Sequence, residues 1–326
     1  MERKLEQIKA VMLGHAVGDA LGVPVEFCER EELAEAPVTD MMGFGTYPVP
    51  AGAWSDDTSM SLAAMASLCK GELDMFEIMT NFIKWLGTGA FTPTGETFDV
   101  GRTCSEAIMD FADMAYSEEY GFIQPPGFDM ADCGKREERS NGNGSLMRIH
   151  PFVLYAHFNQ LPMSGWMELI KNASSLTHAH ERSVLGCLIY TFVLFHILAD
   201  PNKDSVALAL RRAECHLREY PELSHYQRLW RVDFAQTPRN EIKSSGYVVD
   251  TLEAALWCVL STNNYRDCVL KAVNLGGDTD TIAAIAGGLA GALYGYGAIP
   301  KEWLNTLLRR DYIEQLCDRA ATNWGR

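Results

Sequence analysis

The chain has 326 residues, 47% of them hydrophobic and 22% charged, which is typical of a folded globular protein and argues against disorder. The formal net charge of −15 works against binding to a phosphate backbone, so we expect no nucleic-acid partner. Nine cysteines without CxxC pairs, and no apolar signal core near Met1, favour a reducing compartment, and we expect a cytoplasmic protein.

Apolar residues recur at three- and four-residue spacing along most of the chain, whereas alternating runs of β-branched residues are nearly absent. This periodicity predicts an all-α fold. Because no flexible linker and no repeat of solenoid length interrupts it, we expect one domain over residues 1–326. The predicted helices lie near residues 3–20, 57–69, 74–87, 99–117, 144–158, 164–175, 178–198, 203–219, 246–261, 264–274, 279–296 and 301–322. The Pro- and Gly-rich segments 36–54 and 120–144 are predicted to be long functional loops.

The first acidic motif is Trp54-Ser-Asp-Asp-Thr58, directly before the apolar run Met60–Leu68. Ser, Asp and Thr are favoured at the start of a helix, so capping alone is one interpretation. A single Asp is enough for capping, however, and two adjacent carboxylates repel each other unless a cation lies between them. The pair therefore favours a metal site. Glu26, earlier in the chain, is a further carboxylate that could join this site or be a solvated surface charge.

The segment Asn141-Gly-Asn-Gly-Ser-Leu-Met-Arg148 is predicted to be a flexible loop that runs into a helix. Free backbone N–H groups and the positive end of a helix dipole suit a diphosphate or a ribose, although a plain turn before a helix has the same sequence. Further on, Thr177-His-Ala-His180 is not predicted to be a metal pair, because two histidines two residues apart do not share a helix face. Capping or contact with a ligand is expected for His178.

The second acidic motif is Gly276-Gly-Asp-Thr-Asp-Thr281, at the start of another apolar helix. Asp278 and Asp280 can turn toward one point at a loop-to-helix junction, where Thr281 adds a hydroxyl. Capping is again the alternative, but the same chemistry at two helix starts favours one shared site. Carboxylates and hydroxyls without nearby His or Cys suit Mg²⁺, or Mn²⁺, better than Zn²⁺. Four carboxylates are enough to hold two ions.

The stretch from Ile282 to Ile299 is almost wholly apolar and reaches only the lower limit for spanning a bilayer. Gly287, Gly291 and Gly295 lie four residues apart, which favours a buried helix packed closely along a glycine face. We therefore expect no association with a membrane.

Taken together and in this order, these segments resemble the ADP-ribosylglycohydrolase family. The matching landmarks are Gly14-His-Ala-Val-Gly-Asp-Ala-Leu-Gly22 with Glu26, Trp54–Thr58, Phe98-Asp-Val-Gly101, Asn141–Arg148, Thr177-His178 and Gly276–Thr281. They span residues 11 to 296, and the pair of acidic motifs is the specific part. The resemblance implies a compact, orthogonal multi-helix domain with a binuclear Mg²⁺ centre in a central cleft.

The resemblance also implies roles for individual residues. The metal ligands would be Ser55, Asp56, Asp57, Asp278, Asp280 and Thr281. The catalytic carboxylates would be Glu26, Asp56, Asp57 and Asp99, of which Asp99 is characteristic of the arginine-directed bacterial branch. The residues that contact ADP-ribose would be Asn143, Gly144, Ser145, Met147, His178 and Asp99.

The function expected from this resemblance is Mg²⁺-dependent hydrolysis that removes mono-ADP-ribose from a modified protein side chain, with arginine as the acceptor. The partners would be the ADP-ribosylated protein and ADP-ribose itself. Two alternatives stay open: another two-metal hydrolase that acts on a phosphoester or an ADP-ribose-like substrate, and a catalytically silent ADP-ribose-binding module. The sequence leaves open the target protein, the oligomeric state (a monomer included), and whether the role is regulation or immunity against an ADP-ribosylating toxin.

Overall fold

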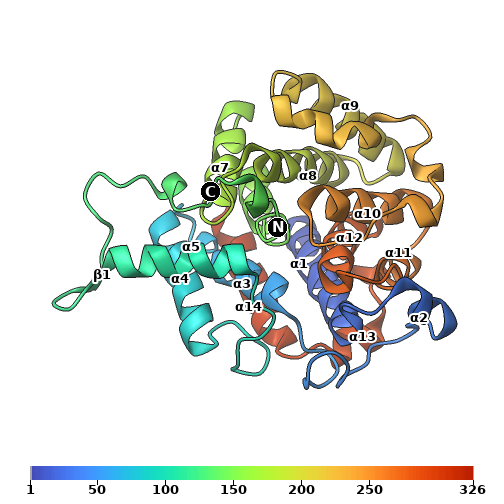
Figure 1. The fold of residues 1–326 in the computed structure, drawn as a ribbon, viewed down its shortest axis with the longest axis horizontal. Coiled ribbons are helices and arrows are strands. Elements are labelled where there is room, and N and C mark those ends of the chain that lie inside the picture. Colours follow the sequence, from blue (N-terminus) through green and yellow to red (C-terminus); the bar gives the residue numbers. More distant parts are fainter. Residues whose placement is uncertain (1, 326) are drawn as a thin grey trace.

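The computed structural model describes residues 2–325 and consists almost entirely of helices (Figure 1). The α-helices are α1 (Glu2–Gly22), α2 (Arg30–Glu35), α3 (Asp56–Leu68), α4 (Met75–Thr88), α5 (Arg102–Ala115), α6 (His150–Phe158), α7 (Met163–Ser175), α8 (Glu181–Ala199), α9 (Lys203–Leu217), α10 (Val248–Ser261), α11 (Tyr265–Val273), α12 (Thr279–Tyr294), α13 (Lys301–Thr306) and α14 (Arg310–Asn323). The 3-10 helices are η1 (Val23–Val25), η2 (Met130–Asp132), η3 (Glu138–Ser140), η4 (Pro221–Trp230), η5 (Phe234–Gln236), η6 (Arg239–Glu241) and η7 (Tyr296–Ala298). Strands β1 (Tyr116–Ser117) and β2 (Gly121–Phe122) pair antiparallel in one hairpin. The all-α prediction is therefore confirmed.

Helices α1 and α12 pack along each other at the centre of the fold (Figure 1). A Cβ on Gly14 would lie 2.5 Å from the carbonyl oxygen of Gly287, and one on Gly22 would lie 2.3 Å from the Cα of Asp280. Only glycine leaves room for two backbones at this distance. Because these contacts pair late residues of α1 with early residues of α12, the helices run antiparallel. The C-terminal end of α1 therefore meets the first turn of α12.

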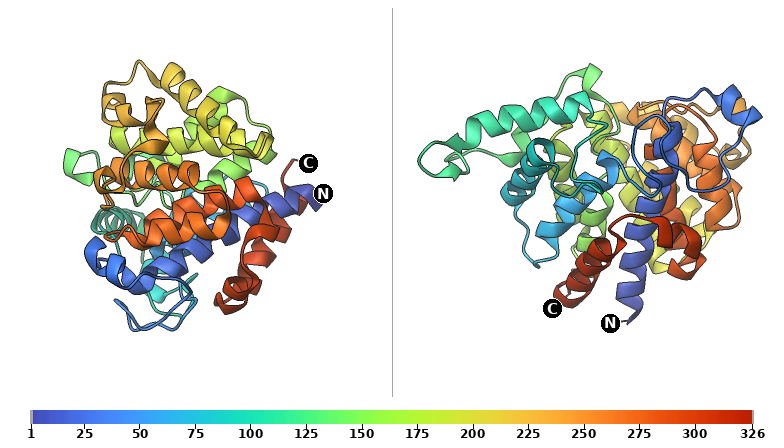
Figure 2. Two further views of the ribbon diagram at one scale, coloured as in Figure 1. Left: turned by 90° about the vertical axis from the view of Figure 1, so that its right-hand side faces the viewer. Right: turned by 90° about the horizontal axis from the view of Figure 1, so that it is seen from below.

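The other helices surround this central pair. Helices α8, α10 and α11 pack against α12, while α3, α6 and α14 pack against α1 (Figure 2). Helix α5 and the β1–β2 hairpin extend away from the body, at the left of Figure 1. The two ends of the described chain lie together, since the ammonium group of Lys4 donates a 2.6 Å hydrogen bond to the carbonyl oxygen of Trp324. Large buried side chains fill the interior, among them Trp54, Trp85, Trp303, Phe82 and Phe152.

Several helix boundaries differ from the sequence prediction. The helix expected from residue 99 begins at Arg102, because Asp99 has a left-handed backbone with φ +51°. The helix expected from residue 144 begins at His150, where Pro151 occupies the first turn. The helix expected over 301–322 is two helices, because the left-handed Arg309, with φ +45°, separates α13 from α14. The loop expected over 120–144 contains β2, η2 and η3, and neither the hairpin nor α2 was predicted.

The glycine-faced helix is buried as expected, with one difference. Gly287 and Gly291 face α1, but Gly295 ends α12 with φ +85° and has no neighbour at its Cβ position. Elsewhere, the segments Glu2–Val25 and Glu181–Ala199 are long and apolar enough to cross a membrane by length and composition. Their apolar windows are 94% and 83% buried in the fold, as in core helices of globular proteins, so the test is weak evidence for a membrane.

Candidate metal centre and active-site cavity

The starts of α3 and α12 meet, although they are more than 200 residues apart in the sequence. The hydroxyl of Thr281 donates a 3.3 Å hydrogen bond to Oδ1 of Asp57. Ligand oxygens of Asp19, Asp57 and Asp280 lie within 4.8 Å of one another, and the same holds for Glu26, Asp99 and Asp280. The structure thus brings the two acidic motifs and Glu26 into one cluster, as the sequence predicts.

At the start of α3, the capping groups are Ser55 and Asp19. The hydroxyl of Ser55 accepts a 3.3 Å hydrogen bond from the N–H of Asp57. One oxygen of Asp19 accepts from the N–H of Ser55 at 2.9 Å, and the other accepts from the N–H and the hydroxyl of Thr58 at 3.0 and 2.6 Å. Since other groups satisfy these donors, capping does not explain the carboxylates of Asp56 and Asp57.

Asp19 is a site residue that the sequence analysis missed. It lies on α1 in the stretch Gly14–Gly22, which resembles the family without predicting a role for Asp19. The signal was a charged residue inside a long apolar helix, where a fully buried carboxylate requires polar partners. Asp19 finds those partners at the start of α3 and so fixes α3 against α1.

At the start of α12, the carboxylates are not caps either. Asp278 precedes the helix, but its side chain accepts no hydrogen bond from the N–H groups of the first turn. Instead its Oδ2 accepts a 2.7 Å hydrogen bond from the amide of Asn143. Asp280 is 1% exposed, and neither of its oxygens has a partner within residues 2–325. The packing of Gly22 against Asp280 holds this turn in place.

The cluster is electrostatically strained without a cation. Asp57 is fully buried, and Oδ2 of Asp57 and Oε2 of Glu26 also lack hydrogen-bond partners in the described chain. Burial and the neighbouring carboxylates raise the pKa values of Asp57 and Asp280 well above the usual range. Burial, then Asp99 and Asp278, raises the pKa of Glu26 to about 9. A buried charge is stable only when it is paired, so this oxygen-only set of donors fits a hard divalent cation.

A cavity of about 240 Å³ opens beside the cluster. Its lining includes the predicted residues Glu26, Asp56, Asp99, Asn143, Gly144, Met147, His178, Asp278 and Thr281. It also includes residues that were not predicted, namely Gly101, Arg102, Thr103, Cys104, Arg139, Gly142 and Gly246. Ser145 lies outside this lining, since it is fully buried and its hydroxyl accepts a 2.9 Å hydrogen bond from Ser174.

The loop that forms one wall of the cavity differs from its predicted form. The N–H of Asn143 donates to the carbonyl oxygen of Gly246 at 3.0 Å, and Gly142 pairs with Tyr247. The N–H of Asn143 is therefore engaged with the chain rather than free, as is the carbonyl oxygen of Asn141, which accepts a 3.1 Å hydrogen bond from the N–H of Val248. Helix α6 begins only at His150, so residues 143–145 do not lie in its first turn. The prediction that the dipole of this helix acts on a ligand at the loop is therefore wrong.

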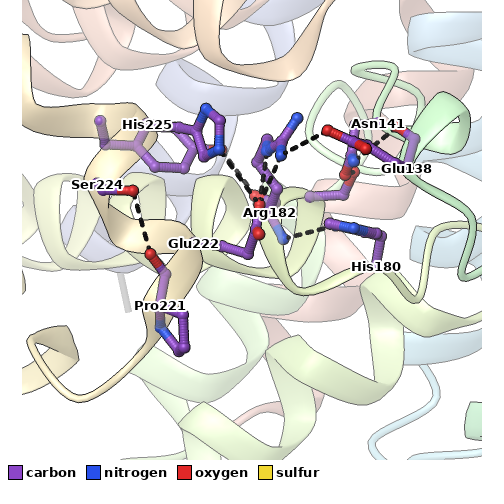
Figure 3. Close-up of polar contacts among 10 residues, drawn as sticks. Glu138, Asn141, His180, Arg182, Pro221, Glu222, Ser224 and His225 are labelled. Atoms are coloured by element: carbon purple, nitrogen blue, oxygen red, sulfur yellow. Dashed lines mark hydrogen bonds and ion pairs between the residues drawn. The ribbon is translucent and has the colours of Figure 1, made fainter.

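His178 lies beside this loop, 2% exposed, and lines the cavity. Burial, and to a lesser extent Arg148, lowers its pKa to about 3, so the ring is neutral at physiological pH. Its Nδ1 is 2.8 Å from the hydroxyl of Thr177. His180 has a different task, because its ring accepts a 3.2 Å hydrogen bond from the N–H of Arg182 and caps α8 (Figure 3). The two histidines thus have different structural partners.

Asp99 lines the cavity and has a strained backbone conformation. Its φ of +51° is uncommon for a residue with a side chain, and such strain collects at functional sites. The hydroxyl of Tyr47 donates a 2.9 Å hydrogen bond to Oδ1 of Asp99. Tyr47 comes from the segment 36–54, so this predicted loop does contribute to the site. The bond holds the Asp99 carboxylate near Glu26, since ligand oxygens of the two residues lie within 4.8 Å of each other.

Known proteins are similar to this chain in both sequence and fold. The sequence profile of the ADP-ribosylglycohydrolase family matches residues 1–326. The chain is 31% identical to the ADP-ribosylarginine hydrolase Tri1 of Serratia proteamaculans, over 97% of this chain and 79% of that protein. It is 33% identical to the ADP-ribosyl-dinitrogen reductase glycohydrolase of Rhodospirillum rubrum, over 90% and 88% of the two chains. A solved structure titled ADP-ribosylglycohydrolase-related protein complex matches with a TM-score of 0.79, 28% identity and 99% coverage of both chains. The chain therefore belongs to the ADP-ribosylglycohydrolase family of enzymes.

Proposed function

We propose that this enzyme releases ADP-ribose from an arginine side chain of a modified protein in the cytoplasm, using two Mg²⁺ ions. The observation that carries the proposal is the convergence of buried, unpartnered carboxylate oxygens from two helix starts beside one cavity. The arginine acceptor is supported by the similarity to the ADP-ribosylarginine hydrolase of Serratia proteamaculans and by the place of Asp99 in the cavity lining.

The residues that would hold the cations share hard oxygen ligands. They are Ser55, Asp56, Asp57, Asp278, Asp280 and Thr281. Ser55 uses one lone pair for its cap, and its hydroxyl retains another for a cation. When bound, divalent cations polarise ribose hydroxyls and lower the pKa of a coordinated water.

The reaction breaks the bond between the anomeric carbon of the distal ribose and a guanidinium nitrogen. Water adds its oxygen to that carbon as the bond to nitrogen breaks, and one of Asp56, Asp57 and Glu26 accepts a proton of the water. The carboxylic acid so formed then gives this proton to the leaving nitrogen. Asp99 contacts the guanidinium group and orients it. The products are ADP-ribose and an unmodified arginine, so atoms and charges balance without a further reactant.

The proposal is tested with arginine-, serine- and cysteine-linked ADP-ribosyl substrates, each with Mg²⁺, with Mn²⁺ and with a chelator. We expect release of free ADP-ribose from the arginine-linked substrate only when a metal is present. Release of inorganic phosphate would instead identify a phosphoester hydrolase, and binding of ADP-ribose without turnover would identify a silent binding module. Preference for another linkage would refute the role given to Asp99.

The biological role of the enzyme depends on which ADP-ribosylated protein is its substrate. An endogenous enzyme as substrate makes this protein a regulator, and substrates modified by an ADP-ribosylating toxin make it an immunity protein. Neighbouring genes and the ADP-ribosylated proteins that accumulate on deletion of the gene distinguish the two.

A further inference from the structure

The guanidinium group of Arg30 ties α2 to segments more than 200 residues away in the sequence. Arg30 is the first residue of that helix. Its Nε donates to the carbonyl oxygen of Leu275 at 2.7 Å, and its Nη1 donates to that of Arg239, also at 2.7 Å. Its Nη2 donates to the carbonyl oxygen of Ile242 at 2.7 Å and to the hydroxyl of Ser244 at 3.1 Å. Every nitrogen of this side chain therefore donates to the chain.

The segment that Arg30 holds lies directly against the turn that carries Asp278. The N–H of Asp278 donates a 2.9 Å hydrogen bond to the carbonyl oxygen of Ser244. Gly277 has φ +74°, and a Cβ there would lie 2.2 Å from that same carbonyl oxygen. Only glycine allows the turn to approach Ser244 so closely. Ser244 therefore sets the position of the Asp278 backbone, and Arg30 holds Ser244.

The same turn is bonded to the stretch of chain between Glu26 and Arg30. The N–H of Phe27 donates to the carbonyl oxygen of Gly277 at 2.7 Å, and the N–H of Gly277 donates to that of Cys28 at 2.9 Å. The chain that carries the Glu26 carboxylate and the turn that carries the second acidic motif therefore form one hydrogen-bonded unit. Arg30 lies at the end of this unit and fixes it to the segment behind it.

The charge of Arg30 does not explain its place. Arg30 lines a second cavity, of about 620 Å³, whose lining also includes Glu26 and Asp278. A positive charge near carboxylates that hold cations repels those cations. The charge therefore works against metal binding, whereas the hydrogen bonds hold the turn with its carboxylate in place. Because the two effects have opposite signs, a change at Arg30 distinguishes them.

We infer that Arg30 is a positioning residue that holds the Asp278 turn in the geometry that binds a divalent cation, an inference that rests on the proposed function. A change in a group that orients a metal ligand lowers metal affinity or activity about 10- to 100-fold. A guanidinium group suits this task because its donors point in fixed directions within one plane, whereas an ammonium group has all its donors on one atom. Arg30 thus acts on the metal centre through the backbone of Ser244 and Asp278.

The experiment measures the dissociation constant for Mn²⁺ from the electron paramagnetic resonance signal of the free ion. Arg30→Gln is expected to raise this constant about tenfold, although it removes a positive charge. Arg30→Lys keeps the charge and loses the planar fork, so it should also bind Mn²⁺ more weakly than the wild type. Arg309→Gln is the matched control, since Arg309 also donates to a distant carbonyl oxygen, that of Thr92 at 2.7 Å, and lies outside both cavity linings. It should leave the constant unchanged.

Unchanged or higher affinity for Mn²⁺ in Arg30→Gln would overturn the inference, since higher affinity is the effect of charge alone. Hydrogen–deuterium exchange gives a second measurement that needs no metal. The N–H groups of Gly277 and Asp278 should exchange faster in Arg30→Gln than in the wild type and in Arg309→Gln. Equal exchange at these groups, or faster exchange along the whole chain, would contradict a specific hold on the turn. A wild-type protein that binds no Mn²⁺ would refute the metal centre of the proposed function, and faster exchange at these two groups in Arg30→Gln would still support the hold on the turn.

Discussion

The starts of α3 and α12 present the same chemistry and are held in different ways. At the start of α3, Ser55 and Asp19 accept hydrogen bonds from N–H groups that have no partner within the helix, so hydrogen bonds hold this start in place. At α12, no side chain caps the first turn, and close packing against Gly22 fixes it instead. In both places the carboxylates of the motif do not cap the helix. The comparison teaches that aspartates at a helix start are candidate metal ligands when other groups, or close packing, stabilise that start.

The largest effect is expected for Asp280→Asn, which tests whether Asp280 is a metal ligand or a helix cap. Asp280→Asn should lower turnover at least about a hundredfold, because changing a residue that only orients a metal ligand already lowers metal affinity or activity about 10- to 100-fold. Removal of a buried charge without a partner should leave the unfolding temperature unchanged or raised when metal is absent. Steady-state release of ADP-ribose and thermal unfolding measure the two effects.

The matched control is Asp74, which caps α4 by accepting a 2.9 Å hydrogen bond from the N–H of Glu77. Asp74→Ala should cost about 1 kcal/mol of stability and leave turnover unchanged. If Asp280→Asn keeps activity within tenfold of the wild type while losing stability as Asp74→Ala does, then Asp280 is structural and the metal assignment is wrong.

Packing at the start of α12 is tested by Gly22→Ala. The new methyl group would lie 2.3 Å from the Cα of Asp280, so α12 must shift, at a cost of about 1–3 kcal/mol. Turnover should fall as well, because Asp280 moves relative to Asp57. Gly288→Ala is the control, since its nearest neighbour, the hydroxyl of Tyr190, would be 3.4 Å away. That change should be neutral or stabilise the helix by up to about 1 kcal/mol. Equal effects of the two changes would contradict the account.

The dependence of stability on pH tests whether the carboxylates at the starts of α3 and α12 form one buried cluster. Folding raises the carboxyl pKa values here, to about 6 for Asp19 and about 9 for Glu26, so the folded state binds more protons than the unfolded state. Without metal, stability should therefore fall as pH rises from about 4, the unfolded value, toward 9. Mg²⁺ should restore it, by about 4 °C at a hundred times its dissociation constant, and more at high pH than at low pH.

Differential scanning fluorimetry from pH 5 to pH 9, with a chelator or with Mg²⁺, measures this dependence. In Asp280→Asn the gain from Mg²⁺ should shrink at every pH. A wild-type unfolding temperature that rises with pH in the chelator would mean that the carboxylates are not buried together.

The helical architecture was predictable because apolar periodicity and the glycine spacing of α12 are local signals. The repeated chemistry of the two acidic motifs favoured one shared site, and the family resemblance strengthened this prediction. Local signals could not show how the motifs meet, since that depends on the antiparallel packing of α1 and α12. Asp19 was missed because its partners are backbone N–H groups of Ser55 and Thr58, which no sequence pattern reveals. The loop at Asn143 was misjudged for the same reason, because its N–H pairs with a carbonyl group more than 100 residues away.

The smallest expected effect concerns Ser55, which caps α3 and is also a proposed metal ligand. Ser55→Ala removes a cap and should cost about 1 kcal/mol of stability. If its hydroxyl also faces a cation, the Mg²⁺ concentration that gives half-maximal turnover should rise as well, and Ser55→Thr, which keeps the hydroxyl, should restore both properties. A loss of stability with an unchanged Mg²⁺ requirement would make Ser55 a cap alone and leave the ligand set at α3 to Asp56 and Asp57. Since α12 has no capping side chain, the two starts would then differ in ligands as well as in how they are held.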